Sequence, residues 1–166
     1  RPAVLANTVV LFVADNGTPA GSLPDPEVEP FTGAKGSLQE GGIHVPFIAA
    51  GVGVGVPGRE VDHLVAALDV FSTVVDLAGA GRSSNPLDSV SLAPVLATPA
   101  APPPRRMVYS VRIVPTGFGP YAKLKRALRA ERYKVVQTLA PVVQLPVRFY
   151  DLLLDPKEDV NLLAPE

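Results

Sequence analysis

An uninterrupted apolar run, NTVVLFVA at residues 7–14, ends directly in an Asp-Asn-Gly triplet at residues 15–17. Such a run, rich in β-branched residues, is typical of a strand covered on both faces, as in a largely parallel sheet. A second run of this kind, VPFIAAG, occupies residues 45–51. The connection from residue 15 to residue 44 is 30 residues long. Irregular connections beyond about 12–15 residues are uncommon unless they build a site or are disordered, so we expect this loop to carry function.

The segment after the second strand, DHLVAALDVFSTVVDLAGAG, predicts a helix that begins at an Asp62 N-cap and stops at Gly79. We expect His63 to lie at a surface cap, and Asp69 and Asp76 on the polar or interdomain surface of the helix. The apolar stripe comprises Leu64, Leu68, Phe71, Val75 and Leu77 or Ala78. Strand, long loop, strand and helix form an α/β fragment, which needs more strands than these residues supply.

Prolines mark a predicted boundary in the chain. Residues 81–106 lack sustained periodicity and end in ATPAAPPPRR, as expected of an extended connector. We therefore predict an α/β segment at 1–80, a Pro-rich connector at 81–106, and a small subdomain at 107–166.

Alternating polar and apolar residues predict an antiparallel sheet with one wet face in the third segment. The pattern covers MVYSVRIV (107–114), KLKRALRAERYKVVQTL (123–139) and VRFYDLLLD (147–155). The middle stretch also fits a helix, but its strand-like YKVV favours a hairpin that turns near residues 130–132. We interpret the charges of KLKRALRAERYK as a solvated face, and DPKEDVNLL as a turn and cap.

Composition excludes several classes of function. The chain has 166 residues, 47% hydrophobic residues and a formal net charge of −1, so it has no basic surplus to attract nucleic acid or an anionic membrane. No apolar run approaches the roughly 20 residues of a membrane span. The absence of cysteine excludes disulfides, thiolate metal sites and a cysteine nucleophile. Because the chain begins with Arg1, we expect it to be cut or processed, and its localisation stays unknown.

The long loop contains FTGAKGSLQEGGIHVPF at residues 31–47, where glycines bracket Lys35 and Glu40. Glycines allow a tight bend and close approach of the backbone to a ligand, and a lysine between them suits an anion as a point charge. FVADNG followed by GAKGSLQEGGIHVPFIAAG resembles the sulfatase family of the alkaline phosphatase superfamily. Three further stretches are similar in order: LDVFSTVVDLAGAG, DSVSLAPVL, and YKVVQTL with FYDLLLDPKEDVNLL.

The resemblance implies roles for individual residues. Asp15 and Asn16 match the Asp-Asn pair that binds a divalent cation, Ca²⁺ or Mg²⁺, whose preference for oxygen ligands suits them. Lys35 matches the lysine that contacts the sulfate ester, and Glu40 a glutamate for which we infer a role in holding the loop. His44 stands where the family often has arginine, and both a catalytic and a packing role are open to it.

The chain also departs from the family pattern. Sulfatases use a formylglycine made in a C/S-x-P-x-R motif, whereas the nearest stretch here, SNPLD at Ser84, lacks the arginine. The paired N-terminal aspartates of the metal site are absent too. The resemblance therefore implies the C-terminal part of a sulfatase α/β domain followed by a small antiparallel sheet, without the nucleophile and without turnover as this isolated fragment.

The implied reaction of the intact enzyme is hydrolysis of a sulfate monoester. A phosphonate or phosphate ester hydrolase of the same superfamily is the alternative enzyme, because a cation and a lysine do not distinguish sulfur from phosphorus. A noncatalytic binding module that retains the fold is the alternative outside enzymes. The expected partners are a sulfate ester and either the missing N-terminal half or a second copy of the chain. The noncatalytic alternative predicts an exposed apolar patch.

Overall fold

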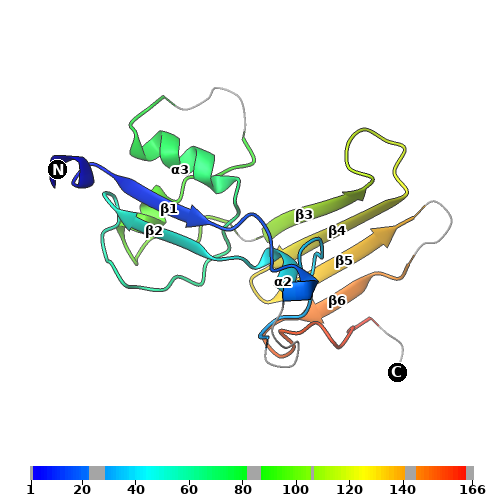
Figure 1. Cartoon of the computed structure of the whole chain (residues 1–166). Coiled ribbons are helices and arrows are strands. Elements are labelled where there is room, and N and C mark those ends of the chain that lie inside the picture. The colour runs from blue at the N-terminus through cyan, green and yellow to red at the C-terminus, as the bar shows by residue number, and fades with distance from the viewer. Residues whose placement is uncertain (1, 23–28, 82–86, 106, 141–144, 164–166) are drawn as a thin grey trace. The chain divides into compact units, whose positions relative to one another are not determined.

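A computed structural model describes residues 2–22, 29–81, 87–105, 107–140 and 145–163 of the chain. The chain forms two compact units (Figure 1). Unit 1 comprises residues 1–14 and 46–106, and unit 2 comprises residues 15–45 and 107–166. The long loop thus groups with the C-terminal sheet instead of with the strands that flank it. The predicted division into residues 1–80, 81–106 and 107–166 stays a prediction.

Unit 1 contains a two-stranded sheet of β1 (Val9–Val13) and β2 (Phe47–Gly51). These strands pair with each other antiparallel, in a register that joins Val9 to Gly51 and Val13 to Phe47. Both strands were expected in a largely parallel sheet, and this expectation is wrong for their mutual pairing. The reason is that a continuous apolar run specifies burial but carries no information on strand direction.

One face of this two-stranded sheet is apolar and exposed. Val10, Phe12 and Ile48 share that face, because Phe12 pairs with Ile48 and Val10 lies two residues before Phe12. Their exposed fractions are 57%, 57% and 58%. The described residues therefore do not cover both faces of β1 and β2, contrary to the expectation from the apolar run. An exposed apolar surface of this kind is a feature that the noncatalytic alternative predicts.

The helices of unit 1 are short. They are α1 (Pro2–Leu5), α3 (Asp69–Leu77) and α4 (Ala93–Ala97). The start of α3 at Asp69 corrects the predicted start at Asp62, and His63 consequently precedes the helix by several residues. The apolar stripe is also only partly covered, since Phe71 is 60% exposed.

Asp69 is fully buried, so its expected position on a polar or interdomain surface is wrong. Its carboxylate accepts hydrogen bonds from the backbone N–H groups of Ala66 at 2.8 Å and Val90 at 2.9 Å, and it pairs with Arg105. An aspartate side chain can accept hydrogen bonds from backbone N–H groups of irregular segments, and here one donor lies just before α3 and the other lies before α4. Asp69 thereby joins α3 to the segment before α4.

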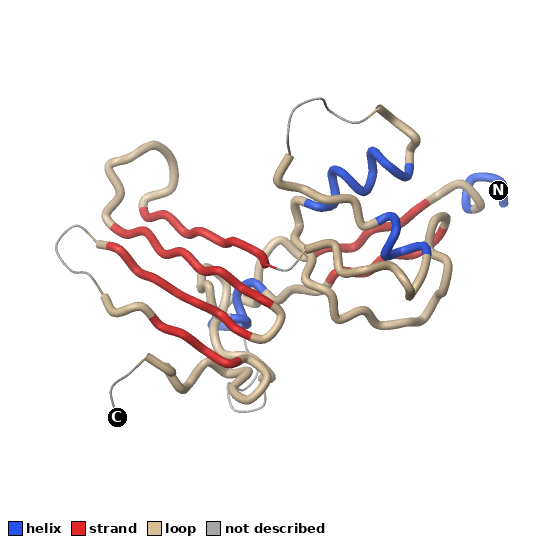
Figure 2. The backbone as a smooth tube through the Cα atoms, turned by 180° about the vertical axis from the view of Figure 1, so that it is seen from behind, coloured by secondary structure: helices blue, strands red, loops and turns tan. Residues whose placement is uncertain are grey.

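Unit 2 contains a four-stranded antiparallel sheet in the order β3-β4-β5-β6, drawn as adjacent red strands in Figure 2. Its strands are β3 (Met107–Val114), β4 (Lys123–Ala130), β5 (Tyr133–Leu139) and β6 (Arg148–Asp151). The predicted antiparallel sheet and its hairpin turn near residues 130–132 are confirmed, and the helical alternative for residues 123–139 is excluded. The long loop adds η1 (Ala20–Ser22) and α2 (Glu40–Ile43). Among the described residues, no helix has the length and apolar character needed to cross a membrane.

Candidate functional site

Backbone hydrogen bonds between distant residues of the long loop hold it in one conformation. The N–H of Gly17 donates to the carbonyl of Gly42 at 3.0 Å, and the N–H of Lys35 donates to the carbonyl of Thr18 at 2.9 Å. The Asp-Asn-Gly turn therefore lies beside both the Gly-Gly pair and the segment that carries Lys35. Residues 17 and 25 positions apart along the chain are thus neighbours in unit 2.

The glycines of the loop are required by the loop's own packing. A Cβ atom on Gly17 would lie 1.9 Å from the carbonyl oxygen of Gly41, and one on Gly41 would lie 2.4 Å from that of Gly33. Real Cβ atoms do not approach a backbone oxygen so closely, because the two atoms would overlap sterically. In addition, Gly33 and Gly36 adopt φ values of +103° and +84°, which L side chains rarely adopt. The sequence predicts close approach at these glycines, and in the structure the approaching group is the loop's own backbone.

Asp15 and Asn16 project two oxygen-bearing side chains next to each other at the end of β1. The Nδ2 group of Asn16 donates a hydrogen bond to Oδ1 of Asp15. Oδ1 of Asn16 is shielded from solvent and has no hydrogen-bond partner among the described residues. A shielded oxygen without a donor is available to a cation, which is the bond that a carboxamide oxygen can supply to Ca²⁺.

Asp15 and Asn16 fit a hard cation but would fill only part of its coordination shell. Calcium takes 6–8 oxygen ligands and magnesium about six. In the part of the chain that the structure describes, no group of three or more His, Cys, Asp or Glu residues is placed to hold a metal ion. The remaining ligands of such a cation would have to be water, substrate or other polypeptide.

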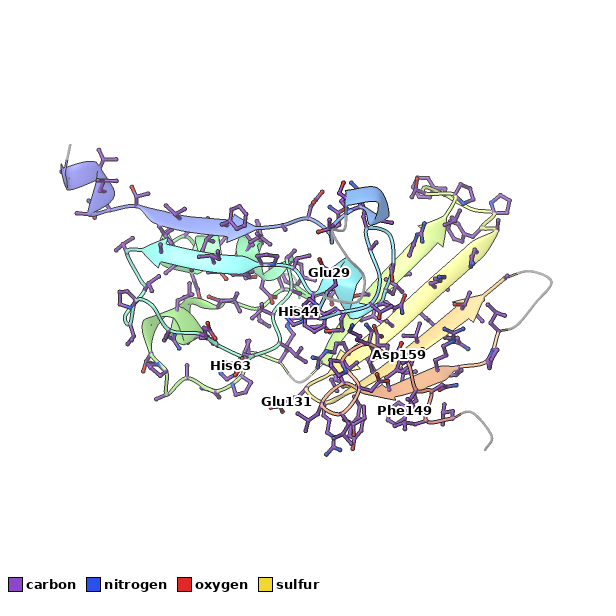
Figure 3. The ribbon with its side chains drawn as sticks, turned by 60° about the horizontal axis from the view of Figure 1, so that its bottom comes forward. Glu29, His44, His63, Glu131, Phe149 and Asp159 are labelled. Carbon is purple, nitrogen blue, oxygen red and sulfur yellow. The ribbon has the colours of Figure 1, made fainter. Side chains whose placement is uncertain are left out.

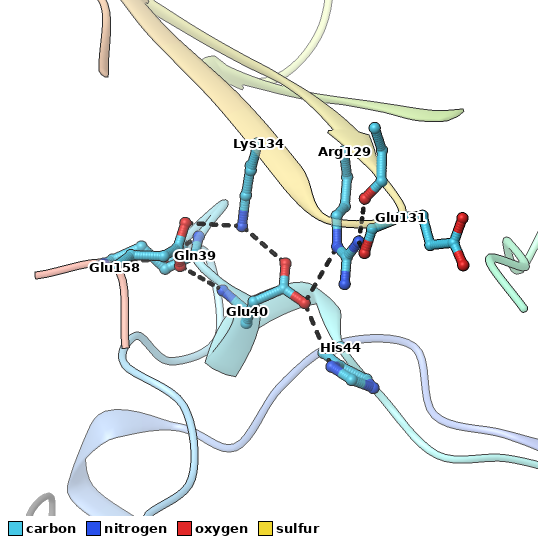
Figure 4. A network of polar contacts seen from close by, with 9 residues as sticks. Gln39, Glu40, His44, Arg129, Glu131, Lys134 and Glu158 are labelled. Carbon is cyan, nitrogen blue, oxygen red and sulfur yellow. Dashed lines mark hydrogen bonds and ion pairs between the residues drawn. The ribbon is translucent and has the colours of Figure 1, made fainter. Parts of the chain in front are cut away.

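Glu40 is the centre of a buried network in unit 2 (Figure 4). Its side chain is only 5% exposed, and its Oε1 lies 3.0 Å from Nζ of Lys134. The same Nζ lies 2.9 Å from Oε1 of Glu158, and Lys134 itself has no exposed surface. The second oxygen of Glu40 lies 3.6 Å from Nε of Arg129. Three segments far apart in sequence therefore meet at one lysine.

The network closes with a backbone contact. Oε2 of Glu158 accepts a hydrogen bond from the N–H of Glu40 at 2.8 Å, at the first residue of α2. Glu158 holds this position with a φ of +58°, an uncommon conformation for a residue with a side chain. The inferred role of Glu40 in holding the loop is supported by these contacts. The interpretation of DPKEDVNLL as a turn and cap agrees with Asp155, whose Oδ2 accepts a hydrogen bond from the N–H of Val160 at 2.8 Å, but the buried Glu158 was missed.

Lys134 and Arg129 were also missed, because the charges of KLKRALRAERYK were interpreted as a solvated face. Lys134 is fully buried and Arg129 is half-buried in the network. A sequence signal for them does exist. The hairpin turn near residues 130–132 pairs Arg129 directly with Lys134 across β4 and β5. Two like charges opposite each other on one face are destabilising unless an acid lies against them, and Glu40 is that acid.

Burial and neighbouring cations shift the pKa of Glu40 in opposite directions. Burial raises the pKa of its carboxyl, but hydrogen bonds and attraction from His44, Lys134 and Arg129 outweigh burial and lower the pKa from 4.5 to about 2. Burial raises the pKa of Glu158 despite the opposing effect of Lys134. The charged form is therefore favoured on Glu40 and disfavoured on Glu158.

The stability of unit 2 should accordingly depend on pH below about 4.5. Because folding lowers the pKa of Glu40, its contribution to stability is complete above pH 4.5 and is lost as the pH falls towards 2. Glu158 acts with the opposite sign, since protonation of a group with a raised pKa favours the folded state. We expect Glu40→Gln to lower the stability of unit 2 at neutral pH. The variant should also lose less stability than the unchanged protein when the pH falls from neutral to about 3. Urea unfolding midpoints at both pH values measure these stabilities. An equal loss of stability on acidification in the variant and in the unchanged protein would contradict the prediction.

His44 lies at the edge of the network (Figure 4), and Figure 3 labels it within the whole chain. Its Nδ1 is 3.3 Å from Oε2 of Glu40, its side chain is 53% exposed, and its ring stacks on Phe31 with centroids 4.6 Å apart. These contacts are those of a packing residue that also pairs with Glu40. A catalytic role of His44 stays a prediction.

Comparisons with known proteins agree with the arrangement of the loop and sheet. A family model described as Sulfatase matches residues 1–80. Among solved structures, a 2-O GAG sulfatase aligns with a TM-score of 0.71 and 28% identity, over 95% of this chain and 32% of that one. The chain is a relative of the sulfatases. The predicted resemblance and the predicted alkaline-phosphatase-like fold class are thereby confirmed.

Two curated sulfatases show the extent of the relationship. Arylsulfatase K of Gallus gallus is 29% identical over 161 residues, which are 96% of this chain and 28% of that protein. Steryl-sulfatase of Rattus norvegicus is 36% identical over 97 residues, which are 54% of this chain and 17% of that protein. The sulfatase-related chain thus spans less than a third of the length of either.

Proposed function

We propose that the long loop forms part of a site for hydrolysis of sulfate monoesters. In this proposal Asp15 and Asn16 bind a divalent cation, Ca²⁺ or Mg²⁺, and Lys35 binds the sulfate. The observation that carries the proposal is the hydrogen bond from the N–H of Lys35 to the carbonyl of Thr18, which keeps the lysine segment beside the Asp-Asn-Gly turn. In this proposal, one fixed loop carries both the side chains that bind the cation and the lysine that binds the sulfate.

The chemistry expected of this arrangement is electrostatic. A bound cation would supply Lewis acidity towards a sulfate oxygen. Lys35, an exposed ammonium on a flexible stem, would bind a sulfate oxygen as a point charge and stabilise the negative charge that develops on reaction. Glu40, Lys134 and Glu158 would not touch substrate and would act by fixing the loop that carries Lys35.

We further propose that the 166-residue chain alone has no turnover. It contains no C/S-x-P-x-R stretch to provide a formylglycine. In this proposal Asp15 and Asn16 supply only two of the six to eight oxygen ligands that calcium takes. The nucleophile and the other ligands would come from further polypeptide, either a missing N-terminal half or another chain. The apolar face at Val10, Phe12 and Ile48 is a surface that such polypeptide, or a second copy, could cover.

The proposal predicts two separate losses of binding. Asp15→Ala should weaken Ca²⁺ binding at least about tenfold, and Lys35→Ala should weaken binding of 4-nitrophenyl sulfate at least about tenfold, each about 1.4 kcal/mol. Amide chemical shifts of residues 15–17 and 33–37 in a ¹⁵N-labelled sample report the two events separately, and they remain measurable for weak binding. Arg126→Ala is the control, because it removes one exposed cation from β4 on the sheet face opposite to the Glu40 network.

Two other outcomes would favour the alternative functions over a sulfate ester hydrolase. Tighter binding of 4-nitrophenyl phosphate than of the sulfate, lost in Lys35→Ala, would favour the phosphonate or phosphate ester hydrolase. No response of residues 15–17 to Ca²⁺ and none of residues 33–37 to either ester would favour the noncatalytic binding module.

A further inference from the structure

One face of the four-stranded sheet carries a group of cations in addition to those that pair with Glu40. Arg112 on β3 pairs directly with Lys125 on β4, and Lys123 lies two residues before Lys125. Arg148 on β6 pairs with Val136, which pairs with Ala127, two residues after Lys125. Directly paired residues and residues two apart share one face of a sheet. We call these four residues, Arg112, Lys123, Lys125 and Arg148, the basic face.

The basic face lacks the acids that accompany the other cations on this side of the sheet. Arg129 and Lys134 share that side, and both pair with Glu40. No residue of the basic face forms an ion pair with a carboxylate of the described residues. Burial, and then repulsion from Lys123, Arg112 and Arg148, lowers the pKa of Lys125. The four cations therefore repel one another and leave an uncompensated positive surface.

The basic face borders the long loop. The guanidinium carbon of Arg112 lies 3.4 Å from the position that a Cβ on Gly36 would occupy. Gly36 directly follows Lys35, and both residues belong to unit 2. Arg112 therefore joins the basic face to the segment for which we propose sulfate binding.

We propose that the basic face binds additional sulfate groups of a substrate that carries two or more of them. Arginine matches a sulfate with two parallel N–H donors, and lysine adds a point charge. Adjacent strands are about 4.8 Å apart, so cations on β3, β4 and β6 offer several anion positions along one direction. This inference rests on the proposed function, in which the sulfate that reacts is bound at Lys35. It adds that the substrate carries further sulfate groups.

Matched arginine variants test the basic face. We expect Arg112→Gln to weaken binding of sucrose octasulfate at least about tenfold, whereas Arg126→Gln, the same change on the opposite face of the sheet, should weaken it less than about twofold. Neither variant should alter the weaker binding of 4-nitrophenyl sulfate. Titration calorimetry at low salt measures the octasulfate, and chemical shifts of residues 33–37 measure the monosulfate.

Different results would contradict the basic face and the proposed function. Equal losses in Arg112→Gln and Arg126→Gln would overturn the basic face as a site and indicate an effect of net charge alone. If Arg112→Gln weakened the monosulfate as much as the octasulfate, the proposed role in binding additional sulfates would also be wrong. If Lys35→Ala left both compounds unaffected while only Arg112→Gln weakened the octasulfate, the proposed function at Lys35 would fail and the basic face would stand. An unchanged urea midpoint in Arg112→Gln would verify that the variant is folded.

Discussion

Lys134→Met is expected to reduce the unfolding free energy of unit 2 by about 3–5 kcal/mol, since it removes one partner of a buried ionic network. Methionine keeps most of the length of the lysine side chain but leaves Glu40 and Glu158 buried without their shared cation. Two carboxylates confined in this way must either remain charged at high cost or take up protons. The variant should therefore also become more stable as the pH is lowered towards 5.

Tyrosine fluorescence can follow this unfolding in unit 2 alone. All four tyrosines of the chain, Tyr109, Tyr121, Tyr133 and Tyr150, lie in residues 107–166, and the chain has no tryptophan. Lys123→Met is the matched control on β4, because Lys123 is exposed and such surface changes usually stay within about 0.5 kcal/mol. The triple variant Lys134→Met, Glu40→Gln and Glu158→Gln should recover part of the loss. A loss below about 1 kcal/mol in Lys134→Met would show that the network does not hold the unit together.

Gly17→Ala is expected to disrupt the conformation of the loop and, with it, binding at Asp15, Asn16 and Lys35. The new methyl group would lie 1.9 Å from the carbonyl oxygen of Gly41. Neither atom can move away by side-chain rotation, because Cβ is fixed on Cα and the oxygen belongs to the backbone. The cost of such overpacking is typically about 1–3 kcal/mol. The chain can reduce this cost by breaking the hydrogen bond from Gly17 to Gly42, which would separate the Asp-Asn-Gly turn from the Gly-Gly pair.

Gly21→Ala is the matched control, because a Cβ on Gly21 would meet no atom within 4 Å. Hydrogen exchange of residues 29–45 should increase in Gly17→Ala and stay unchanged in Gly21→Ala. Binding of Ca²⁺ and of 4-nitrophenyl sulfate should fall together in Gly17→Ala, whereas Asp15→Ala and Lys35→Ala separate them. Protection equal to that of the unchanged protein would mean that the loop does not depend on this close approach.

Local patterns were sufficient to predict much of this fold. The alternation in residues 107–155 predicts the antiparallel sheet, because each strand has one buried face and one wet face. The glycines around Lys35 indicate a tightly bent loop, and Glu40 was correctly expected to hold it. These features depend on residues close together in the sequence or on one motif, so a single sequence contains them.

Features that depend on long-range partners could not be predicted in the same way. Asp69 appears as a polar residue on a helix, yet it is buried, and two of its partners, the N–H of Val90 and the side chain of Arg105, lie 21 and 36 residues later in the chain. Lys134 appears as one charge among many, and its burial requires Glu40 and Glu158 from two other segments. The antiparallel pairing of β1 with β2 likewise depends on the path of the loop between them, which apolar composition does not encode.

The loop leaves the β1–β2 ladder and returns to it at nearly the same point, since the N–H of Ala14 donates to the carbonyl of Pro46 at 3.2 Å. The residues between them belong to unit 2 and include Asp15, Asn16 and Lys35, for which we propose ligand binding. Glu158, near the end of the chain, contacts this loop through the N–H of Glu40. A ligand bound at Lys35 or Asp15 would thus stabilise the C-terminal sheet by mass action. Conversely, substitution or truncation at Glu158 should weaken ligand binding at Lys35 and Asp15, more than a hundred positions earlier in the chain.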